Sequence, residues 1–311
     1  MRWAYIGIVR PMISYGAVAW SHSITTKKHL ALLNRLDRLA LLGITQTAPS
    51  VPTRGLSIAY DVLPLHLHLK RTAIASYVRL PHSYELTWDG KGHTLRHGRA
   101  HRLVWHELAE EWSLPRPGDL DGLTLLSGRK SYRVITDSFS GDRKFLTPAQ
   151  YNIFSDGSKI NNRVGSGAAV YRSKTLIRSV CCSLPEYTSV FLAEVHAIRL
   201  GVEALMEEVA EAAYVKIFVD SRAALQALGA RTFKSASVAR THDALNRLAA
   251  RGSTVSLSWI KAHVNHVGNE QADRLAKAGS QMIGPPIWVG QPSSLARATL
   301  EERVMEEWSE F

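Results

Sequence analysis

The chain has 311 residues, of which 45% are hydrophobic, and a formal net charge of +11. This composition is that of one large or two ordinary globular domains and excludes a disordered chain. No apolar run is long enough to cross a bilayer, and the N-terminus lacks the layout of a secretory signal, so we expect neither membrane attachment nor secretion. The two cysteines, Cys181 and Cys182, are adjacent and poorly placed for a structural disulfide, which indicates an intracellular protein, nuclear or cytoplasmic.

The positive charge is concentrated in the first half of the chain. Residues 1–150 contain 20 Lys and Arg against 11 Asp and Glu, a net +9, whereas residues 151–311 contain 18 against 16, a net +2. Because neutralisation of phosphates drives affinity for nucleic acids, a basic half indicates a polyanionic partner. A basic surface that serves only solubility is the alternative.

Residues 1–81 are predicted to be a helical region. The first long helix is expected to begin at a cap formed by Thr25 or Thr26 and to end at Gly43. Its apolar stripe is predicted to consist of Leu32, Leu33, Leu36 and Leu39, and its basic outer face of Lys28, Arg35 and Arg38. Such a face either is simply solvated or contacts nucleic acid. A second helix is expected around residues 65–80.

Residues 82–147 are rich in His, Gly, Pro and charged residues and are predicted to be a connector with little structure, apart from a short helix around 101–112. Residues 148–281 are predicted to form a separate domain. Residues 282–311 are expected to be a tail with an amphipathic helix at 294–308, whose apolar face is Leu300, Val304 and Trp308.

From Tyr151 the pattern becomes regular α/β. Strands are expected at 151–155, 165–173, 175–184, 214–221 and 254–260, and helices at 190–209, 222–228, 237–250 and 268–278. The order βββαβααβα predicts a mixed five-stranded sheet with helices on its faces.

Three carboxylates occupy places where a carboxylate is costly. Asp156 ends the first predicted strand, Asp220 ends the fourth, and Glu194 shares the sheet-facing stripe of an apolar helix. If the first and fourth strands are parallel neighbours, the two aspartates lie side by side, and the helix can place Glu194 between them. Since carboxylates so close raise one another's pKa, a divalent cation is expected, and all-oxygen ligation favours Mg²⁺ or Mn²⁺.

Each of these acids also has a purely structural explanation. Asp156 precedes Gly-Ser and could be a turn residue, Asp220 could cap the following helix, and Glu194 could be a partly exposed helix acid. Their joint occurrence favours the metal site.

A fourth acid lies in "WIKAHVNHVGNEQADRLAKAG". Asn269 and Asp273 are four residues apart on the flank of the last predicted helix, and His263 lies in the loop before it. His263 and His266 could be zinc ligands, but neither a Cys nor a third His is near them in the sequence, so zinc is not favoured.

The stretches "SDGS", "AEVHAI", "VDSRAAL" and "WIKAHVNHVGNEQADRLA" occur in the order and spacing of the type 1 ribonuclease H family, which residues 151–280 resemble. The resemblance implies a ribonuclease H fold and cleavage of the RNA strand of RNA–DNA hybrids with two Mg²⁺ ions, Mn²⁺ being possible. Where the family often has a polar residue that contacts nucleic acid, this chain has Leu192.

The resemblance also implies roles for individual residues. Asp156 and Asp273 would hold the ion that orients and acidifies the attacking water. Asp156, Glu194 and Asp220 would hold the ion that stabilises the leaving oxygen. His263 would move a proton or assist product departure. Ser158 and Asn269 are candidate contacts to the substrate.

Residues 3–80 resemble the end of a non-LTR retrotransposon reverse transcriptase beyond its palm, through "YIGIVRPMISYGAVAW" and "TRGLSIAYDVLPLHLHLKRTA". The acid pair of a polymerase is absent from this stretch, so the chain is not expected to polymerise DNA. The resemblance implies retroelement replication, with the upstream reverse transcriptase region as a possible partner of a monomeric chain.

Three functional hypotheses follow. The first is a metal-dependent endonuclease on RNA–DNA hybrids, and the presence of all four acids and His263 favours it. The second is an inactive retroelement fragment that only binds nucleic acid. The third is a nuclease of the same fold that acts on DNA or single strands.

Overall fold

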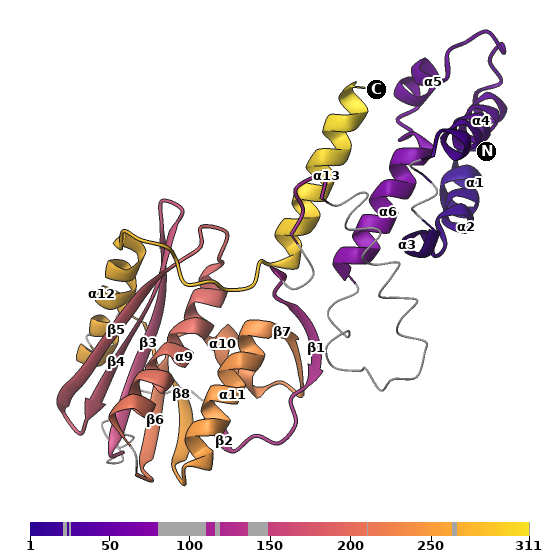
Figure 1. The fold of residues 1–311 in the computed structure, drawn as a ribbon. Coiled ribbons are helices and arrows are strands. Elements are labelled where there is room, and N and C mark those ends of the chain that lie inside the picture. Colours follow the sequence, from indigo (N-terminus) through magenta and orange to yellow (C-terminus); the bar gives the residue numbers. More distant parts are fainter. Residues whose placement is uncertain are drawn as a thin grey trace. The chain divides into compact units, whose positions relative to one another are not determined.

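This computed structural model describes residues 1–20, 24, 26–79, 110–115, 119–135, 149–209, 211–262 and 266–310. The chain forms two compact units (Figure 1). The first, here called the helical unit, comprises Met1–Leu120 and Ser293–Phe311, and the second, the sheet unit, comprises Asp121–Pro292. No helix in the described part of the chain is long and apolar enough to cross a membrane.

The helical unit consists of short N-terminal helices followed by longer ones. They are α1 (Arg2–Ala4), the π-helix η1 (Tyr5–Val9), α2 (Arg10–Ser14), α3 (Ala17–Trp20), α4 (Lys27–Thr45), α5 (Thr53–Ala59), α6 (Leu65–Arg79) and α13 (Ser293–Glu310). The helices predicted around residues 65–80 and 294–308 correspond to α6 and α13. Most of the short helix predicted at 101–112 lies outside the described residues.

Helices α6 and α13 pack together although they are far apart in the sequence. Ile74 of α6 and Leu300 and Val304 of α13 are buried in one apolar cluster. At the edge of this cluster Lys70 Nζ lies 3.0 Å from a carboxylate oxygen of Glu307. The C-terminal helix therefore completes the core of the helical unit through Leu300 and Val304 of its predicted apolar face, whereas Trp308 is half-buried outside this cluster.

Helix α4 buries a different face from the one we predicted. Leu33, Asp37 and Leu41 are buried, at a spacing of four, whereas three of the four predicted stripe residues are exposed. Those three are Leu32, Leu36 and Leu39. The predicted stripe was wrong because it was drawn from leucines alone, whereas the buried face includes Asp37, and a carboxylate can be buried where hydrogen-bond donors meet it.

The ends of α4 agree with the prediction at one terminus only. Thr26 caps the start, its side chain accepting from the backbone N–H of His29. Gly43 does not end the helix, which continues to Thr45 and stops where Gln46 adopts a left-handed conformation with φ of 53°. A left-handed residue after the last turn is a common helix end, and a non-glycine residue supplies it here.

The predicted basic face of α4 is only partly solvent-exposed. Lys28 and Arg35 are exposed. Arg38 is half-buried and its guanidinium donates to the carbonyl oxygens of Val51 and Pro49 and to Thr53 Oγ1. Arg38 therefore fixes the α4–α5 connection instead of extending a nucleic-acid face.

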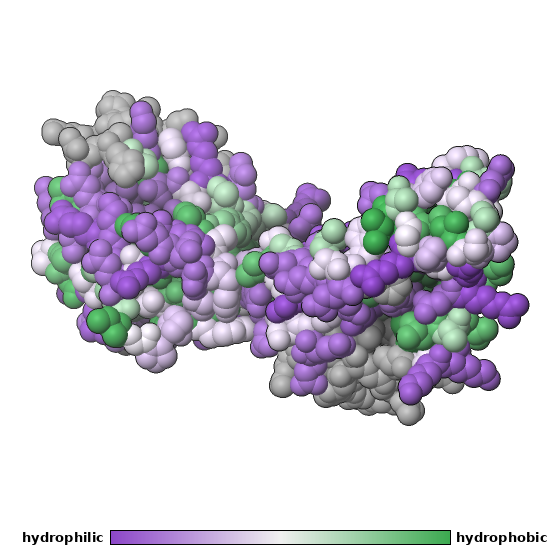
Figure 2. All heavy atoms as spheres, turned by 90° about the horizontal axis from the view of Figure 1, so that it is seen from above, coloured by the Kyte–Doolittle hydropathy of each residue, from purple (hydrophilic) through white to green (hydrophobic). Residues whose placement is uncertain are grey.

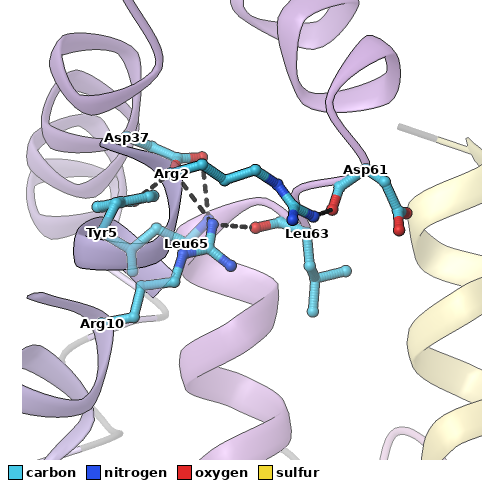
Figure 3. A network of polar contacts seen from close by, with 7 residues as sticks. All are labelled: Arg2, Tyr5, Arg10, Asp37, Asp61, Leu63 and Leu65. Atoms are coloured by element: carbon cyan, nitrogen blue, oxygen red, sulfur yellow. Dashed lines mark hydrogen bonds and ion pairs between the residues drawn. The ribbon is translucent and has the colours of Figure 1, made fainter. Parts of the chain in front are cut away.

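The buried carboxylate of Asp37 joins three segments of the helical unit (Figure 3). Its Oδ1 accepts a hydrogen bond from the Tyr5 hydroxyl at 2.6 Å and lies 3.3 Å from Arg10 Nη2, and its Oδ2 accepts from the backbone N–H of Leu65 at 3.1 Å. Arg10 also donates to the carbonyl oxygen of Leu63. Side chains of Arg10 and Asp37 are only 5% and 4% exposed. The acid is therefore a fully engaged structural group.

Asp37→Ala is expected to lower the free energy of unfolding of the helical unit by about 3–5 kcal/mol, because it leaves the buried Arg10 charge without its partner. Hydrogen exchange of the α4 and α6 amides during chemical denaturation measures this loss. Arg35→Ala, on the exposed side of the same helix, serves as the control and is expected to change little. Equal protection in Asp37→Ala and wild type would contradict the structural role.

The helical unit exposes many large apolar side chains. They include Trp3, Ile8, Met12 and Tyr15 near the N-terminus and Leu32, Leu36 and Leu39 of α4. Figure 2 shows hydrophobic residues gathered on the visible face of this unit, whereas the visible face of the sheet unit is mainly hydrophilic. Groups of this kind are typical of surfaces that another molecule covers.

The sheet unit contains a six-stranded mixed sheet. Its strands are β2 (Tyr132–Ile135), β3 (Tyr151–Ile160), β4 (Arg163–Arg172), β5 (Thr175–Leu184), β6 (Tyr214–Val219) and β8 (Thr254–Trp259), in the order β2-β8-β6-β3-β4-β5. The pairs β3–β4 and β4–β5 are antiparallel, and β2, β8, β6 and β3 are parallel neighbours. The α/β fold class is confirmed, as is the parallel pairing of the first and fourth predicted strands.

Helices cover both faces of this sheet. They are α9 (Val190–Glu208), α10 (Arg222–Gly229), α11 (Ala236–Ala250) and α12 (Val267–Gln281). Helices α9 and α12 lie on opposite faces (Figure 1). The main core, with Ile153, Ile198 and Leu257 at its centre, fills the space under α9, α10 and α11. The sheet thereby holds the ends of its strands rigidly, which matters for the acids placed there.

The predicted connector contains two strands that join the sheet unit. β1 (Gly122–Leu126) pairs antiparallel with β7 (Thr232–Ser235), and β2 adds a sixth strand beside β8. The Tyr132 hydroxyl donates to the Leu228 carbonyl oxygen at 3.1 Å and lies 3.0 Å from His242 Nδ1. Five strands were predicted because such short strands carry too few residues for a periodic signal, and they gain their stability from pairing.

Candidate metal centre

Asp156 and Asp220 come together where two parallel strands separate. The pairing of β3 with β6 ends at Ser155 and Val219, so Asp156 is the next residue of β3 and Asp220 is the residue that follows β6. The prediction that the first strand ends at Asp156 was wrong, because β3 continues to Ile160 along β4, where Asp156 pairs with Gly167. The backbone at Asp156 is therefore still paired with β4, although its pairing with β6 has ended.

The structure removes two of the structural explanations for these aspartates. Asp156 lies within a strand and not in a turn. Asp220 does not cap the following helix, since Ser221 is the cap and its hydroxyl accepts from the backbone N–H of Ala224 at 3.3 Å. Neither aspartate is thus needed to form the local backbone.

Glu194 reaches the same place from α9. The helix is capped by Ser189, whose side chain accepts from the backbone N–H of Leu192, and Glu194 follows in its second turn, 8% exposed. A Cβ on Gly157 would lie only 2.5 Å from the Glu194 backbone nitrogen. Glycine after Asp156 therefore allows α9 to pack against β3 closely enough to bring the third acid to the site.

Asp156, Glu194 and Asp220 form a group that could hold a metal ion. One carboxylate oxygen from each residue lies within 4.8 Å of the others. Glu194 Oε2 is buried and has no hydrogen-bond partner in the described part of the chain. An oxygen-only donor set with an unsatisfied buried oxygen fits a hard divalent cation such as Mg²⁺.

Burial and mutual repulsion raise the pKa of two of these acids. Burial, with the charges of Asp220 and Asp273, raises the pKa of Asp156 from 3.8 to about 7. Burial, followed by the charges of Asp220 and Asp156, raises the pKa of Glu194 from 4.5 to about 9. A cation that binds here replaces protons and restores the charged form of each carboxylate.

Asp273 lies beside the group of three without being part of it. It sits on α12, half-buried, and a hydrogen bond with it contributes to the raised pKa of Asp156. Its Oδ2 accepts from Lys277 Nζ at 2.7 Å. Asp273 is therefore close enough to Asp156 to share an ion with it, and its role as a ligand stays a prediction.

Asn269, which we predicted as a substrate contact, lies beside Asp220, an acid of the candidate metal site. It is 6% exposed, and its Nδ2 donates to Asp220 Oδ2 at 3.4 Å. Its position at the start of α12 thus orients Asp220. Ser158 is buried on β3, and Leu192 is buried in the core of the unit. His263 lies outside the described residues.

Two residues near the site were not identified from the sequence. Trp259 ends β8, and its indole N–H donates to the Asp220 carbonyl oxygen at 3.0 Å. The Arg222 guanidinium lies 4.1 Å from the centre of the Trp259 ring. Only the strand register places Trp259 here, because it pairs with Val219, the residue before Asp220. Trp259 thus holds the backbone of Asp220, the residue that follows β6, and Arg222 packs on the Trp259 ring.

Residues 148–281 match the family model of RNase H. Two solved structures are similar to the chain, each at 18% sequence identity. The N-terminal RNase H domain of rv2228c from Mycobacterium tuberculosis, fused to maltose-binding protein, has a TM-score of 0.35 and covers 43% of this chain and 94% of its own. RNase H1 from the halophilic archaeon Halobacterium salinarum has a TM-score of 0.34, with 42% and 97% covered. No curated protein sequence matches the chain.

Gly157→Ala is expected to push α9 away from β3, because the added Cβ would meet the Glu194 and Ala193 backbone within 2.7 Å. The expected result is an affinity for Mg²⁺ reduced by about tenfold or more, since the support of a ligand residue is lost. A Mg²⁺ titration of the melting temperature measures this change. Gly229→Ala, where a Cβ meets nothing within 4 Å, is the matched control.

The metal-free protein is expected to lose stability as the pH rises. The folded-state pKa values of about 7 for Asp156 and about 9 for Glu194 lie above those of an unfolded chain. Between the unfolded and the folded pKa of each group, the folded state therefore binds more protons than the unfolded chain does. The free energy of unfolding should be greatest below about pH 4 with respect to these groups and fall up to about pH 9. Melting curves across this range in EDTA test the slope. Mg²⁺ should flatten it, and identical profiles with and without Mg²⁺ would refute the cation site.

Proposed function

We propose that this protein, which carries a ribonuclease H domain at residues 148–281, hydrolyses the RNA strand of RNA–DNA hybrids with two divalent metal ions. The observation that supports this best is the group of Asp156, Glu194 and Asp220, whose carboxylate oxygens lie within 4.8 Å of one another. Such a group is costly without cations and is suited to binding them. Mg²⁺ is the expected ion, and Mn²⁺ is a substitute with the same donor preference.

In this mechanism the position of each acid determines which metal ion it would hold. Divalent ions held by these acids would supply a water of lowered pKa and would stabilise charge on the leaving oxygen. Burial and the charges of both Asp220 and Asp273 raise the pKa of Asp156, so Asp156 would be the acid able to hold both ions. Glu194 and Asp220 would hold one ion together with Asp156, and Asp273 would hold the other with it. Asn269 and Trp259 keep Asp220 in place through its side chain and its carbonyl oxygen.

His263 is proposed to move a proton or assist product release, since it precedes α12 in the sequence and an ordinary imidazole titrates near neutral pH. Ser158 is proposed to contact the substrate from the strand that carries Asp156. Recognition of the RNA strand rests on 2′-hydroxyl contacts and the shape of the hybrid.

The wider setting is proposed from the N-terminal sequence. Residues 3–80 resemble the end of a non-LTR retrotransposon reverse transcriptase, so the activity would serve retroelement replication inside the cell. The exposed apolar side chains of the helical unit, such as Trp3 and Met12, fit a unit that packs against an upstream polymerase region.

The test is cleavage of a hybrid whose RNA strand carries the label. The wild-type chain with Mg²⁺ should shorten the RNA and leave the DNA intact. Asp156→Asn should reduce the rate by about 10³-fold or more, because several kcal/mol of charge stabilisation are lost. Glu207→Gln, on the exposed side of α9 where Glu207 pairs with Arg178, is the control and should cleave normally.

Other outcomes would identify other functions. Undiminished cleavage by Asp156→Asn would refute the metal mechanism. Cleavage of the DNA strand would indicate a DNA nuclease of the same fold. Binding of the hybrid without any cleavage would favour a nucleic-acid-binding module that has lost its activity.

A further inference from the structure

A hollow of about 400 Å³ lies between α6 and α13 in the helical unit, and a volume of this size suits a small molecule. Its described lining contains more charged and hydroxyl side chains than apolar ones. The lining consists of Arg71, Thr72, Ala75 and Ser76 of α6 and of Arg297 and Glu301 of α13. None of these residues belongs to the candidate metal centre, so the hollow is a separate candidate site.

The two helices hold the lining on a rigid backbone. Ala73 and Ile74 of α6 and Ala296 and Leu300 of α13 are each adjacent in sequence to a lining residue, and all four are buried in one apolar cluster. Figure 1 shows the two helices side by side. Because close-packed side chains fix the helices against each other, the hollow is already formed before a ligand binds.

The two arginines of the hollow differ in their partners. Arg71 Nε donates to Glu301 Oε1 at 2.9 Å, and its Nη2 lies 2.8 Å from Glu301 Oε2, so both carboxylate oxygens are engaged. Arg297 lies one turn before Glu301 on α13 and is exposed, and it makes no hydrogen bond or ion pair with another described residue. Two arginines against one acid give the lining a net charge of 2 − 1 = +1.

Two hydroxyl groups lie one turn apart on the α6 side. Thr72 Oγ1 donates to the His68 carbonyl oxygen at 2.7 Å, so its oxygen is left to accept a hydrogen bond. The Ser76 hydroxyl makes no hydrogen bond with another described residue and is able to donate. A guanidinium and a hydroxyl without partners are donors that phosphate oxygens accept, and the planar guanidinium matches phosphate geometry.

We propose that this hollow binds a small phosphomonoester of the size of a nucleotide, with Arg297 and Ser76 as the contacts to its phosphate. The net positive charge favours an anion, and the hollow is larger than a phosphate ion, so the ligand carries a further group. Thr72 is placed to accept from a hydroxyl of that group. The inference does not rest on the proposed ribonuclease activity, because the lining lies outside the matched residues 148–281.

Isothermal titration calorimetry of the full chain with adenosine 5′-monophosphate tests the site. EDTA is present so that no divalent ion at the metal centre recruits the phosphate. The wild type should bind the nucleotide and should not bind adenosine, which lacks the phosphate. Arg297→Gln should weaken binding by about tenfold or more and Ser76→Ala by about threefold. Arg303→Gln, an exposed arginine of the same helix that pairs with Glu306 outside the hollow, is the matched control and should bind normally.

Glu301→Gln gives a prediction of the opposite sign. Removal of the acid releases Arg71 and raises the net charge of the lining by one, so adenosine 5′-monophosphate should bind more tightly. A variant that fails to fold cannot gain affinity, so this change separates a binding role from a structural one.

Ribose 5-phosphate distinguishes the two sources of such a group. Binding as tight as that of the nucleotide would assign the hollow to sugar phosphates, and weaker binding would assign it to nucleotides. No binding of either compound by the wild type, or equal affinity in Arg297→Gln and wild type, would overturn the proposal. Cleavage of the hybrid plays no part in this measurement, so a chain that binds the nucleotide without cleaving RNA would refute the proposed function alone.

Discussion

Repulsion among three close carboxylates, of which Asp156 and Glu194 are buried and Asp220 is half-buried, is the constraint on which the sheet unit depends. Asp156 and Asp220 follow the last paired residues of β3 and β6, and Glu194 is brought to them because Gly157 lets α9 approach the strand. Without a cation, ionised carboxylates at this place are unfavourable, since burial and like charges both oppose ionisation. The arrangement costs stability and fits a site that could hold a divalent ion.

The two units show how a buried acid that supports structure differs from one that serves a site. Asp37 is met by a hydroxyl, a guanidinium and a backbone N–H, so its charge is balanced by protein groups (Figure 3). Glu194 has a buried oxygen without a protein partner in the described residues, and acids are its nearest charges. Both residues are almost fully buried, so burial alone does not distinguish them. What distinguishes the two acids is the number of hydrogen-bond donors around each carboxylate.

Strands β1 and β2, which precede the matched residues 148–281, enlarge the sheet unit beyond the matched domain. Strand β2 covers β8, which would otherwise present an unpaired edge, and Tyr132 anchors it through Leu228 and His242. Strand β1 extends the surface on the α11 side. A unit that spans Asp121–Pro292 therefore includes a segment whose composition suggests a connector, because these short strands are stabilised by their partners and not by their own sequence.

The sequence by itself determined the fold class, most helices and strands from 151 onward, and the neighbourhood of Asp156 and Asp220, because periodicity and strand order are local properties that the chain carries in its residues. Only the tertiary structure decided which face of α4 is buried, that Asp156 lies inside a longer strand, and that Trp259 supports Asp220. These depend on partners far away in the chain: Tyr5 and Arg10 for Asp37, β4 for Asp156, and the register of β8 with β6 for Trp259. A residue's pairing partner across the fold is set by packing, and packing leaves no pattern along a single sequence.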